Sequence, residues 1–495
     1  MVRFHKRNGI VACGHPLTAE AGARMFQNGG NAVDAAVAAA FASCVCEATL
    51  TGLWGGGFAL VFSAPTRSAN LFDFFVNMPG LGKQWSRDGL DFKGIQADFR
   101  GALQEFHIGR ASVGVPGNVL GFYHLHKVYG ALPFGEVLAP AIAFAKNGFP
   151  VTKNQAFVSQ ILKPFLTDTP GARQVFAPKG ALLSAGEKLH IPQLATTLEA
   201  LAREGPRLFY QGELGQKMAA FFQDGGLITQ KDLDAYRVMV RKPLKTIYRG
   251  ETILMNPKPS SGGNLIAYSL KLLEARSFRR QSFASADFLK ILIEVMRQTN
   301  QTRGEKEKRN PNLLGSTTHI SVMDEAGNAV GITTSHGSGA GIAVPGLGLP
   351  FNNMLGEEDL NPLGFFQMPA GVRFSSMMCP VMAVKRGRPR LVLGSGGSNR
   401  LRTAILQALV KRINFKMPLK KAVEGVRIHW EADLLNVEPG LPQKTVQALL
   451  DFHPKSVLWK DRNFFFGGVH AVERKRNRLN GAGDPRRGGV VRKVV

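Results

Sequence analysis

Cysteine is scarce in this 495-residue sequence, which contains only Cys13, Cys44, Cys46 and Cys379. None of them forms a Cys-x-x-Cys pair, and no histidine-rich stretch accompanies them, so neither a zinc site nor any other metal site is predicted. Cys44 and Cys46 lie two residues apart in an apolar, helix-like run, where a cysteine usually behaves as a small buried apolar residue. No disulfide framework and no cofactor are therefore predicted.

Long apolar runs are also lacking. The most apolar stretch, residues 35–46, is about half as long as a membrane-spanning helix. The start of the sequence, MVRFHKRNGIVAC, contains basic residues but no apolar core of the kind that a secretory signal needs. As written, the sequence predicts a cytoplasmic protein.

Acidic residues are few, with 36 Asp and Glu against 62 Lys and Arg, and the formal net charge is +26. The excess concentrates in residues 471–495 (8 − 2 = +6) and 276–309 (9 − 4 = +5). Such charge attracts nucleic acid, anionic membranes or acidic substrates. No aromatic-interleaved binding motif accompanies the basic residues, so no specific nucleic-acid partner is predicted and a solvated surface is the simpler interpretation.

The remaining composition is that of a folded protein large enough for one layered domain or for two or three smaller ones. Helix-like and strand-like segments alternate without strict βαβ repetition, which favours a layered α/β or α+β fold. The glycine loop at 51–57 lacks the Lys-Ser/Thr of a phosphate-binding loop, so we interpret it as tight backbone packing. A short strand is expected at 391–393, followed by a glycine-rich loop at 394–399.

The stretch 314–339, LGSTTHISVMDEAGNAVGITTSHGSG, predicts a hairpin that begins with two threonines. A threonine hydroxyl is a weak nucleophile unless a base lies beside it, and one solution is a threonine whose own α-amine serves as that base. The charged segment 302–313 predicts an exposed connector just before the threonines. Cleavage between Ser316 and Thr317 would then create such a nucleophile.

Other residues have the chemistry that an acyl intermediate needs. Ser335 or Thr333 on the second strand is a candidate to orient Thr317. Gly396 and Gly397 are candidates to present backbone N–H groups to an oxyanion. Ser375 and Ser376 offer donors for a carboxylate, and the acidic residues 357–359 offer charge for an amine. Each feature alone is common in strands, turns and loops, and only their order and spacing together favour catalysis.

The segment TTHISVMDEAGNAV resembles the start of the small subunit of γ-glutamyltranspeptidases, which are N-terminal-nucleophile hydrolases. The resemblance extends over nearly the whole chain, through GIVACGHPLTAEAGARMFQNGGNAVDAAVAAAFA, GSGGSNR and the closing GAGDPRRGG. It implies a four-layer αββα sandwich of the α+β class. It also implies a zymogen that cleaves itself into a large subunit (1–316) and a small subunit (317–495), which together form one αββα domain.

The resemblance also implies roles for particular residues. Thr317 matches the nucleophile, and Ser335 matches its supporting hydroxyl. Gly396 and Gly397 match the oxyanion hole, and the pair Ser375 and Ser376 matches the residues that bind the glutamyl α-carboxylate. Glu357 falls near the acidic residue that binds the α-amine. Members of this family are commonly exported, which implies a periplasmic or extracellular location instead of the cytoplasmic one.

Three positions depart from the family pattern. The motif Arg-Glu-x-Ala-Pro, whose arginine pairs with the glutamyl α-carboxylate, is replaced by a segment ending in Pro79 that contains no arginine. An asparagine that recognises the donor is replaced by Gly337, and the amine-binding glutamine is replaced by Met354. Loss of an arginine–carboxylate contact should cost about 2 to 3 kcal/mol of binding free energy. Amide chemistry is therefore predicted more firmly than glutamyl specificity.

Three hypotheses follow. The first is an autoprocessing γ-glutamyltransferase and hydrolase, with glutathione as the default donor and water, an amino acid or a peptide as acceptor. The second is an amidase or a cephalosporin-type acylase with a non-glutamyl donor. The third is a silent binding protein of the same fold, for example for acidic polymers. In the first two, the partners are a small-molecule amide, the two subunits of one precursor and possible further copies of the chain.

Overall fold

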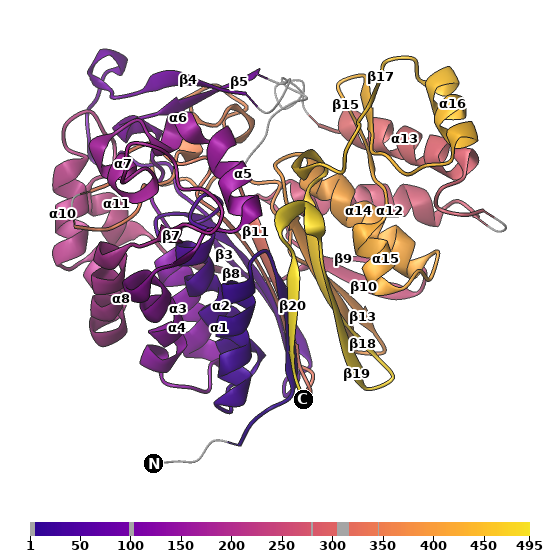
Figure 1. The fold of residues 1–495 in the computed structure, drawn as a ribbon, viewed down its shortest axis with the longest axis horizontal. Helices are drawn as coiled ribbons and strands as arrows, with labels where there is room; N and C mark the ends of the chain where they lie inside the picture. Colours follow the sequence, from indigo (N-terminus) through magenta and orange to yellow (C-terminus); the bar gives the residue numbers. More distant parts are fainter. Residues whose placement is uncertain (1–4, 99–102, 279–280, 304–315, 345) are drawn as a thin grey trace.

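The computed structural model describes residues 5–98, 103–278, 281–303, 316–344 and 346–495. Two antiparallel sheets pack face to face, and helices cover the outer face of each sheet (Figure 1). The predicted α+β class and four-layer αββα sandwich are confirmed. Most of the predicted connector at 302–313 lies outside the described residues.

The seven-stranded sheet combines strands from both predicted subunits. Its order is β20 (Val490–Val494), β1 (Gly9–Cys13), β11 (Thr318–Asp324), β12 (Ala329–Ser335), β2 (Gly56–Ser63), β3 (Ser68–Phe74) and β8 (Met239–Arg241). The strands β11, β12 and β20 follow the predicted cleavage site, and the others precede it. The subunit boundary itself stays a prediction.

The six-stranded sheet contains strands from the second half of the chain. Its order is β19 (Arg478–Gly483), β18 (Gly468–Lys475), β14 (Arg388–Gly396), β13 (Val381–Lys385), β10 (Glu251–Met255) and β9 (Leu244–Tyr248). β14 and β18 of this sheet pack against β11 of the seven-stranded sheet, so the centres of the two sheets face each other.

Each outer layer consists of helices from one part of the chain. The seven-stranded sheet is covered by α1 (Pro16–Gln27), α2 (Ala32–Cys46) and α3 (Asn118–Tyr129). Outside them, α4 (Phe134–Asn147) packs on α2, and α8 (Pro192–Glu204) packs on α4. The six-stranded sheet is covered by α12 (Gly262–Glu274), α14 (Arg400–Ile413) and α15 (Leu419–Glu424), and α13 (Ala286–Gln301) packs on α12.

Smaller elements surround these layers. They are α5 (Lys153–Ile161), α6 (Lys163–Leu166), α7 (Pro170–Phe176), α9 (Arg207–Tyr210), α10 (Glu213–Phe221), α11 (Gln230–Ala235), α16 (Gln443–Phe452), β4 (Lys93–Asp98), β5 (Leu103–Ile108), β6 (Phe149–Pro150), β7 (Lys188–Leu189), β15 (Ile428–Glu431), β16 (Leu434–Val437) and β17 (Ser456–Leu458).

The alternation of side chains along the strands builds two cores. In β1, Ile10 and Ala12 pack between the two sheets, whereas Val11 and Cys13 pack against the helices. α2 is buried on every side, and a capping box in which the Asn31 side chain accepts from two backbone N–H groups fixes its start. Small residues therefore dominate α2, because alanine lets the helix lie close to its neighbours.

The described part of the chain contains no helix long and apolar enough to span a bilayer. All four cysteines are buried and free. Among the described residues, no group of three or more His, Cys, Asp or Glu side chains is placed to hold a metal ion.

Candidate active site

The predicted cleavage site is buried at the start of β11. Ser316 and Thr317 are each 4% exposed. The Thr317 hydroxyl donates a hydrogen bond of 2.8 Å to the carbonyl oxygen of Ser316, and the Ser335 hydroxyl donates to the same oxygen. The hydroxyl of Thr317 therefore lies beside the carbonyl that it would attack, and the second hydroxyl polarises that carbonyl.

The hairpin register explains why Ser335 reaches this position. Thr318 pairs with Thr334, so the residues just beyond them, Thr317 and Ser335, are neighbours. The backbone N–H of Gly337 donates to the Ser335 hydroxyl at 3.0 Å, which leaves the hydroxyl proton free to point at Ser316. Thr333, the other candidate for this role, instead bonds to the His319 ring at 2.8 Å.

The second threonine of the pair faces the opposite side of the sheet, as successive strand residues do. Its hydroxyl donates to the carboxylate of Glu47 at 2.6 Å, and Thr18 donates to the other carboxylate oxygen at 2.8 Å. Burial raises the pKa of Glu47 to about 7. The sequence signal for Glu47 was a lone acidic residue directly after an apolar helix.

Gly396, the last residue of β14, lies against Thr317, the predicted nucleophile, and Gly397 follows it. A Cβ on Gly396 would be 2.2 Å from the carbonyl oxygen of Thr317, so only glycine fits there. Gly397 has φ +123°, which also favours glycine. The expected strand at 391–393 was too short: β14 continues to Gly396, and Gly394 lacks a Cβ because the His319 ring occupies that space.

The glycine loop before β2 is tight backbone packing, as expected. A Cβ on Gly55 would be 2.2 Å from the carbonyl oxygen of Ser335, and a Cβ on Gly57 would be 2.4 Å from the carbonyl oxygen of Thr333. The loop therefore supports the strand that carries Ser335.

Arg487 also belongs to this site, although no role for it was predicted from the sequence. Its guanidinium is buried against the Phe464 ring at 3.4 Å and donates to the carbonyl oxygen of Thr317 at 3.3 Å. It also lies behind the glycine pair, because a Cβ on Gly396 would be 3.1 Å from one of its nitrogens. Burial, with the nearby Arg400, lowers the pKa of Arg487 to about 9. Its only sequence signal was its place in the closing GAGDPRRGG motif.

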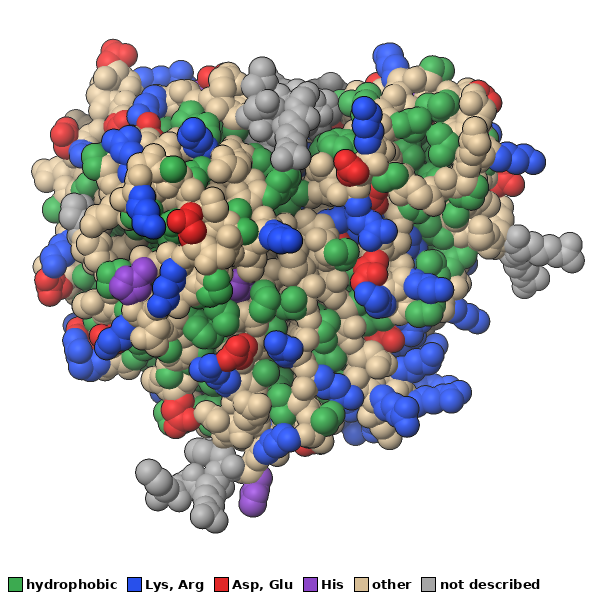
Figure 2. All heavy atoms as spheres, viewed as in Figure 1, with side chains coloured by type: hydrophobic (Ala, Val, Ile, Leu, Met, Phe, Trp, Pro, Cys, Tyr) green, Lys and Arg blue, Asp and Glu red, His purple; other side chains and the backbone are tan. Residues whose placement is uncertain are grey.

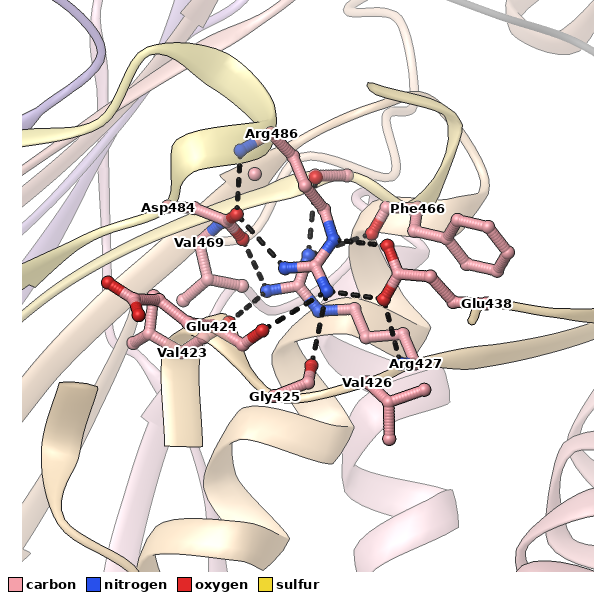
Figure 3. Close-up of polar contacts among 12 residues, drawn as sticks. Val423, Glu424, Gly425, Val426, Arg427, Glu438, Phe466, Val469, Asp484 and Arg486 are labelled. Carbon is pink, nitrogen blue, oxygen red and sulfur yellow. Dashed lines mark hydrogen bonds and ion pairs between the residues drawn. The ribbon is translucent and has the colours of Figure 1, made fainter. Parts of the chain in front are cut away.

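A buried charge cluster fixes the turn that carries Arg487. Figure 3 shows the guanidinium groups of Arg427 and Arg486 between the carboxylates of Asp484 and Glu438. Asp484 also accepts from the backbone N–H of Val469 in β18 at 3.0 Å. Burial alone would raise the pKa of Asp484, but Arg427 and Arg486 lower it to about 2.

A cavity of about 30 Å³ adjoins Thr317, which is room for one or two water molecules. Of the predicted site residues, it is lined by Ser316, Thr317, Ser335, Glu357 and Ser376. With the Ser316–Thr317 bond intact, the cavity is therefore too small for an acyl donor.

Ser375 lies apart from this cavity. Its hydroxyl donates to the carbonyl oxygen of Pro259 at 2.7 Å, and the side chain is partly exposed. Only Ser376 of the predicted serine pair therefore faces the cavity.

The acidic wall of the cavity is formed by Glu357 and Asp359. Burial and, next, the charge of Asp359 raise the pKa of Glu357 well above its usual value. Burial also raises the pKa of Asp359, against the hydrogen bond of 2.7 Å from the Ser398 hydroxyl. A raised carboxyl pKa favours the neutral acid, which makes this wall a weaker partner for an ammonium group.

The three departures from the family pattern meet at the same cavity or directly beside it. Counting back four residues from Pro79 places Phe75 where the pattern has arginine, and Phe75 and Met354 both line the cavity. Gly337 has φ +69°, and a Cβ on it would be 2.2 Å from an oxygen of Asn353 and 2.9 Å from an oxygen of Glu357. No asparagine can occupy position 337 without rebuilding this wall.

The chain is similar to known proteins over most of its length. The profile of the family described as gamma-glutamyltranspeptidase matches residues 18–310 and 300–494. The Acylase ACY 1 proenzyme of Pseudomonas sp. (strain V22) is 34% identical over 89% of this chain and 86% of its own length. The glutathione hydrolase proenzyme of Escherichia coli (strain K12) is 30% identical over 97% of this chain and 90% of its own length. The crystal structure of cephalosporin acylase from Bacillus halodurans superposes with a TM-score of 0.82 and 26% identity, covering 98% of this chain and 96% of that one.

Proposed function

This chain belongs to the γ-glutamyltranspeptidase family of N-terminal-nucleophile hydrolases, and we propose that it is an acylase whose donor lacks the α-ammonium group of a γ-glutamyl amide. The observation that carries this proposal is the wall at Gly337. Where the family pattern has an asparagine that recognises the donor, Asn353 and Glu357 fill the space of any side chain.

The proposed reaction begins with self-cleavage. The Thr317 hydroxyl oxygen attacks the carbonyl carbon of Ser316, its proton passes to the departing nitrogen, and the peptide becomes an ester. Water then hydrolyses the ester, which leaves a carboxylate on Ser316 and a free amine on Thr317. The products are a large subunit, 1–316, and a small subunit, 317–495.

Turnover uses the same groups. The new α-amine takes the proton of the Thr317 hydroxyl as the oxygen attacks the donor carbonyl, and then passes it to the leaving amine. The N–H groups of Gly396 and Gly397 stabilise the oxyanion. Water or an amine acceptor then releases the acyl group from Thr317.

The cavity lining supports a less polar donor than a γ-glutamyl amide. A γ-glutamyl group ends in an ammonium and a carboxylate. Phe75 offers no partner for the carboxylate, and Met354 offers only a thioether to the ammonium. A dicarboxylic monoamide such as a glutaryl amide keeps one carboxylate, which Ser376 can receive. Because one similar structure is that of a cephalosporin acylase, the side-chain amide of a β-lactam is the first such donor to test.

The second candidate is a γ-glutamyl amide, with glutathione as the default donor. Ser376 and Glu357 favour it, because both line the cavity and match the family's donor-binding residues. The glutathione hydrolase relatives favour it as well.

A panel of anilides decides between the two donors. We expect kcat/KM for glutaryl or butyryl p-nitroanilide to exceed that for γ-glutamyl p-nitroanilide. Thr317→Ala serves as the control for contaminating hydrolases and should release no nitroaniline. A clear preference for the γ-glutamyl compound would overturn the proposal in favour of the second candidate.

A further inference from the structure

The opposite end of the sandwich carries a basic groove that the proposed reaction does not use. Four β-hairpin turns meet there, β2–β3, β11–β12, β13–β14 and β18–β19, and all but the β11–β12 turn carry an arginine with positive φ. Two adjoining cavities of about 670 and 290 Å³ share Arg388, Pro389 and Arg474 and form one open groove. Its basic lining residues are Arg67, Lys385, Arg386, Arg388, Arg390, Arg474 and Arg476.

This groove is separate from the acyl-transfer site. β14 runs from Arg388 at the groove to Gly396 at the oxyanion glycines. Nine residues of extended strand span roughly 30 Å. A molecule in the groove therefore does not touch Thr317.

Positive charge dominates the groove. Among the described residues that line it, Glu325 is the single acidic one, and the Asn8 side chain donates to that carboxylate. Arg390 pairs with Glu251 at 3.0 Å, and Arg474 donates to backbone carbonyls of the β11–β12 turn. In Figure 2, Lys and Arg side chains gather at the lower right, around the lower ends of β13, β18 and β19.

The backbone of the three turns that carry these arginines gives the sharper argument. Arg67, Arg386 and Arg476 have φ of 49°, 51° and 47°, a left-handed conformation in which asparagine and glycine are favoured. Their side chains are exposed, and none of the three makes a side-chain hydrogen bond or ion pair to the described part of the chain.

Arg249 is the internal comparison. It occupies the same left-handed position, with φ 50°, in the β9–β10 turn. Its guanidinium donates to Asn414 and to the carbonyl oxygens of Leu273 and Glu274 at the end of α12, so its side chain stabilises the fold. The three groove arginines occupy an equally unfavourable backbone position and stabilise no contact of this kind.

We propose that the groove binds a linear polyanion, and that its arginine side chains contact the phosphate backbone of that polyanion. Arginine forks fit phosphate oxygens, and several along one groove match a chain of phosphates. In the part of the groove that the structure describes, the only aromatic lining residue, Phe62, is buried, so base stacking and sequence readout are not expected. A concave groove also fits a chain better than a flat bilayer, which would touch only the turn tips.

The test uses asparagine as the replacement. In Arg67→Asn/Arg386→Asn/Arg476→Asn, each new residue suits the left-handed turn, so the variant should fold at least as stably as the unmodified protein. Binding of fluorescent inorganic polyphosphate and of an oligo-dT strand is measured by anisotropy over a range of salt concentrations. Lys179→Gln/Lys188→Gln/Lys217→Gln, which removes the same charge from the α7–α10 region, is the matched control.

We expect both probes to bind the unmodified protein, and the groove variant to bind at least tenfold more weakly at 0.1 M salt. A plot of the logarithm of the association constant against the logarithm of the salt concentration has a negative slope. In the groove variant this slope should become shallower by about 2, because three phosphate contacts are lost. Hydrolysis of the preferred anilide should not change. Equal loss in the control variant would overturn the proposal, as would unchanged binding in the groove variant. Binding to phosphatidylserine vesicles without binding to either soluble chain would also overturn it and assign the surface to membranes.

Discussion

The acyl-transfer region and the donor-recognition wall of this molecule lie side by side but differ in what they tolerate. In the first, Thr317, Ser335 and Gly396 are locked together by contacts between backbone and hydroxyl groups. In the second, Phe75 and Met354 line the cavity, and the family pattern has different side chains at these positions. A region built from backbone contacts can hardly change by substitution, whereas a region built from side chains can exchange its chemistry one residue at a time.

Removal of the nucleophile should have the largest effect. We expect Thr317→Ala to remain a single chain and to lose at least ~10³-fold in turnover, because neither self-cleavage nor an acyl intermediate can form without the hydroxyl. Intact mass and a denaturing gel measure the first result, and anilide hydrolysis measures the second. Thr317→Ser keeps a hydroxyl and should retain both activities at reduced rates. Two fragments from the alanine variant would refute the assignment.

The carboxyl group under the nucleophile strand should make stability depend on pH. The pKa of Glu47 is about 7 in the folded chain, above its usual value, so the folded state binds this proton more tightly than the unfolded state does. Its contribution to the free energy of unfolding is therefore complete below pH 4.5 and is lost as the pH rises through 7. The difference is about 3 kcal/mol.

Denaturant unfolding at pH 4.5 and pH 8 measures this effect. The Glu47→Gln variant, which cannot ionise, should lack this part of the pH dependence. A curve for the variant that parallels that of the unmodified protein would show that Glu47 does not titrate in this range.

Arg487 tests whether the acyl-transfer region depends on more than its predicted residues. In Arg487→Met, loss of the charged donor to the Thr317 carbonyl should cost about 1.5 to 2 kcal/mol, or roughly 10- to 30-fold in kcat. KM should change little, since Arg487 does not line the cavity. Arg487→Lys keeps the charge but not the planar guanidinium group, and its kcat should lie between those of the unmodified protein and Arg487→Met. Equal losses for both variants with lowered thermal stability would indicate a purely structural role.

The sequence predicted the acyl-transfer region better than the wall, for a physical reason. Thr317 lies just before the first strand of a hairpin and Ser335 ends the second, and the alternation and turn of that hairpin are visible in the sequence, so strand pairing brings the two residues together. The four-layer fold followed from the family resemblance, because the intermixed helices and strands alone left α/β and α+β open.

The rest depended on contacts between distant segments. Nothing local distinguishes Arg487 from its neighbour Arg486, yet one reaches Thr317 and the other joins the buried charge cluster. Similarly, the sequence does not distinguish Ser375 from Ser376. Only the folded backbone shows that the Ser375 side chain points towards Pro259 and not into the cavity. The predicted strand was shorter than β14 because glycines are typical of loops. In β14 the missing Cβ atoms leave room for the His319 ring and for the backbone of Thr317.

The smallest predicted effect probes whether the recognition wall can be changed back. Methionine and glutamine have similar size, so Met354→Gln should fold normally and return one hydrogen-bonding side chain to the cavity. We expect the ratio of kcat/KM for γ-glutamyl over glutaryl anilide to rise about 5- to 10-fold, the value of one hydrogen bond of about 1 to 1.4 kcal/mol. Met354→Leu, which restores no polar group, should leave the ratio unchanged. The increase should stay modest because Gly337 and Phe75 still deny the donor its other two partners. A ratio that does not move in the glutamine variant would mean that position 354 does not contact the donor, and that the wall is set by Gly337 and Phe75 alone.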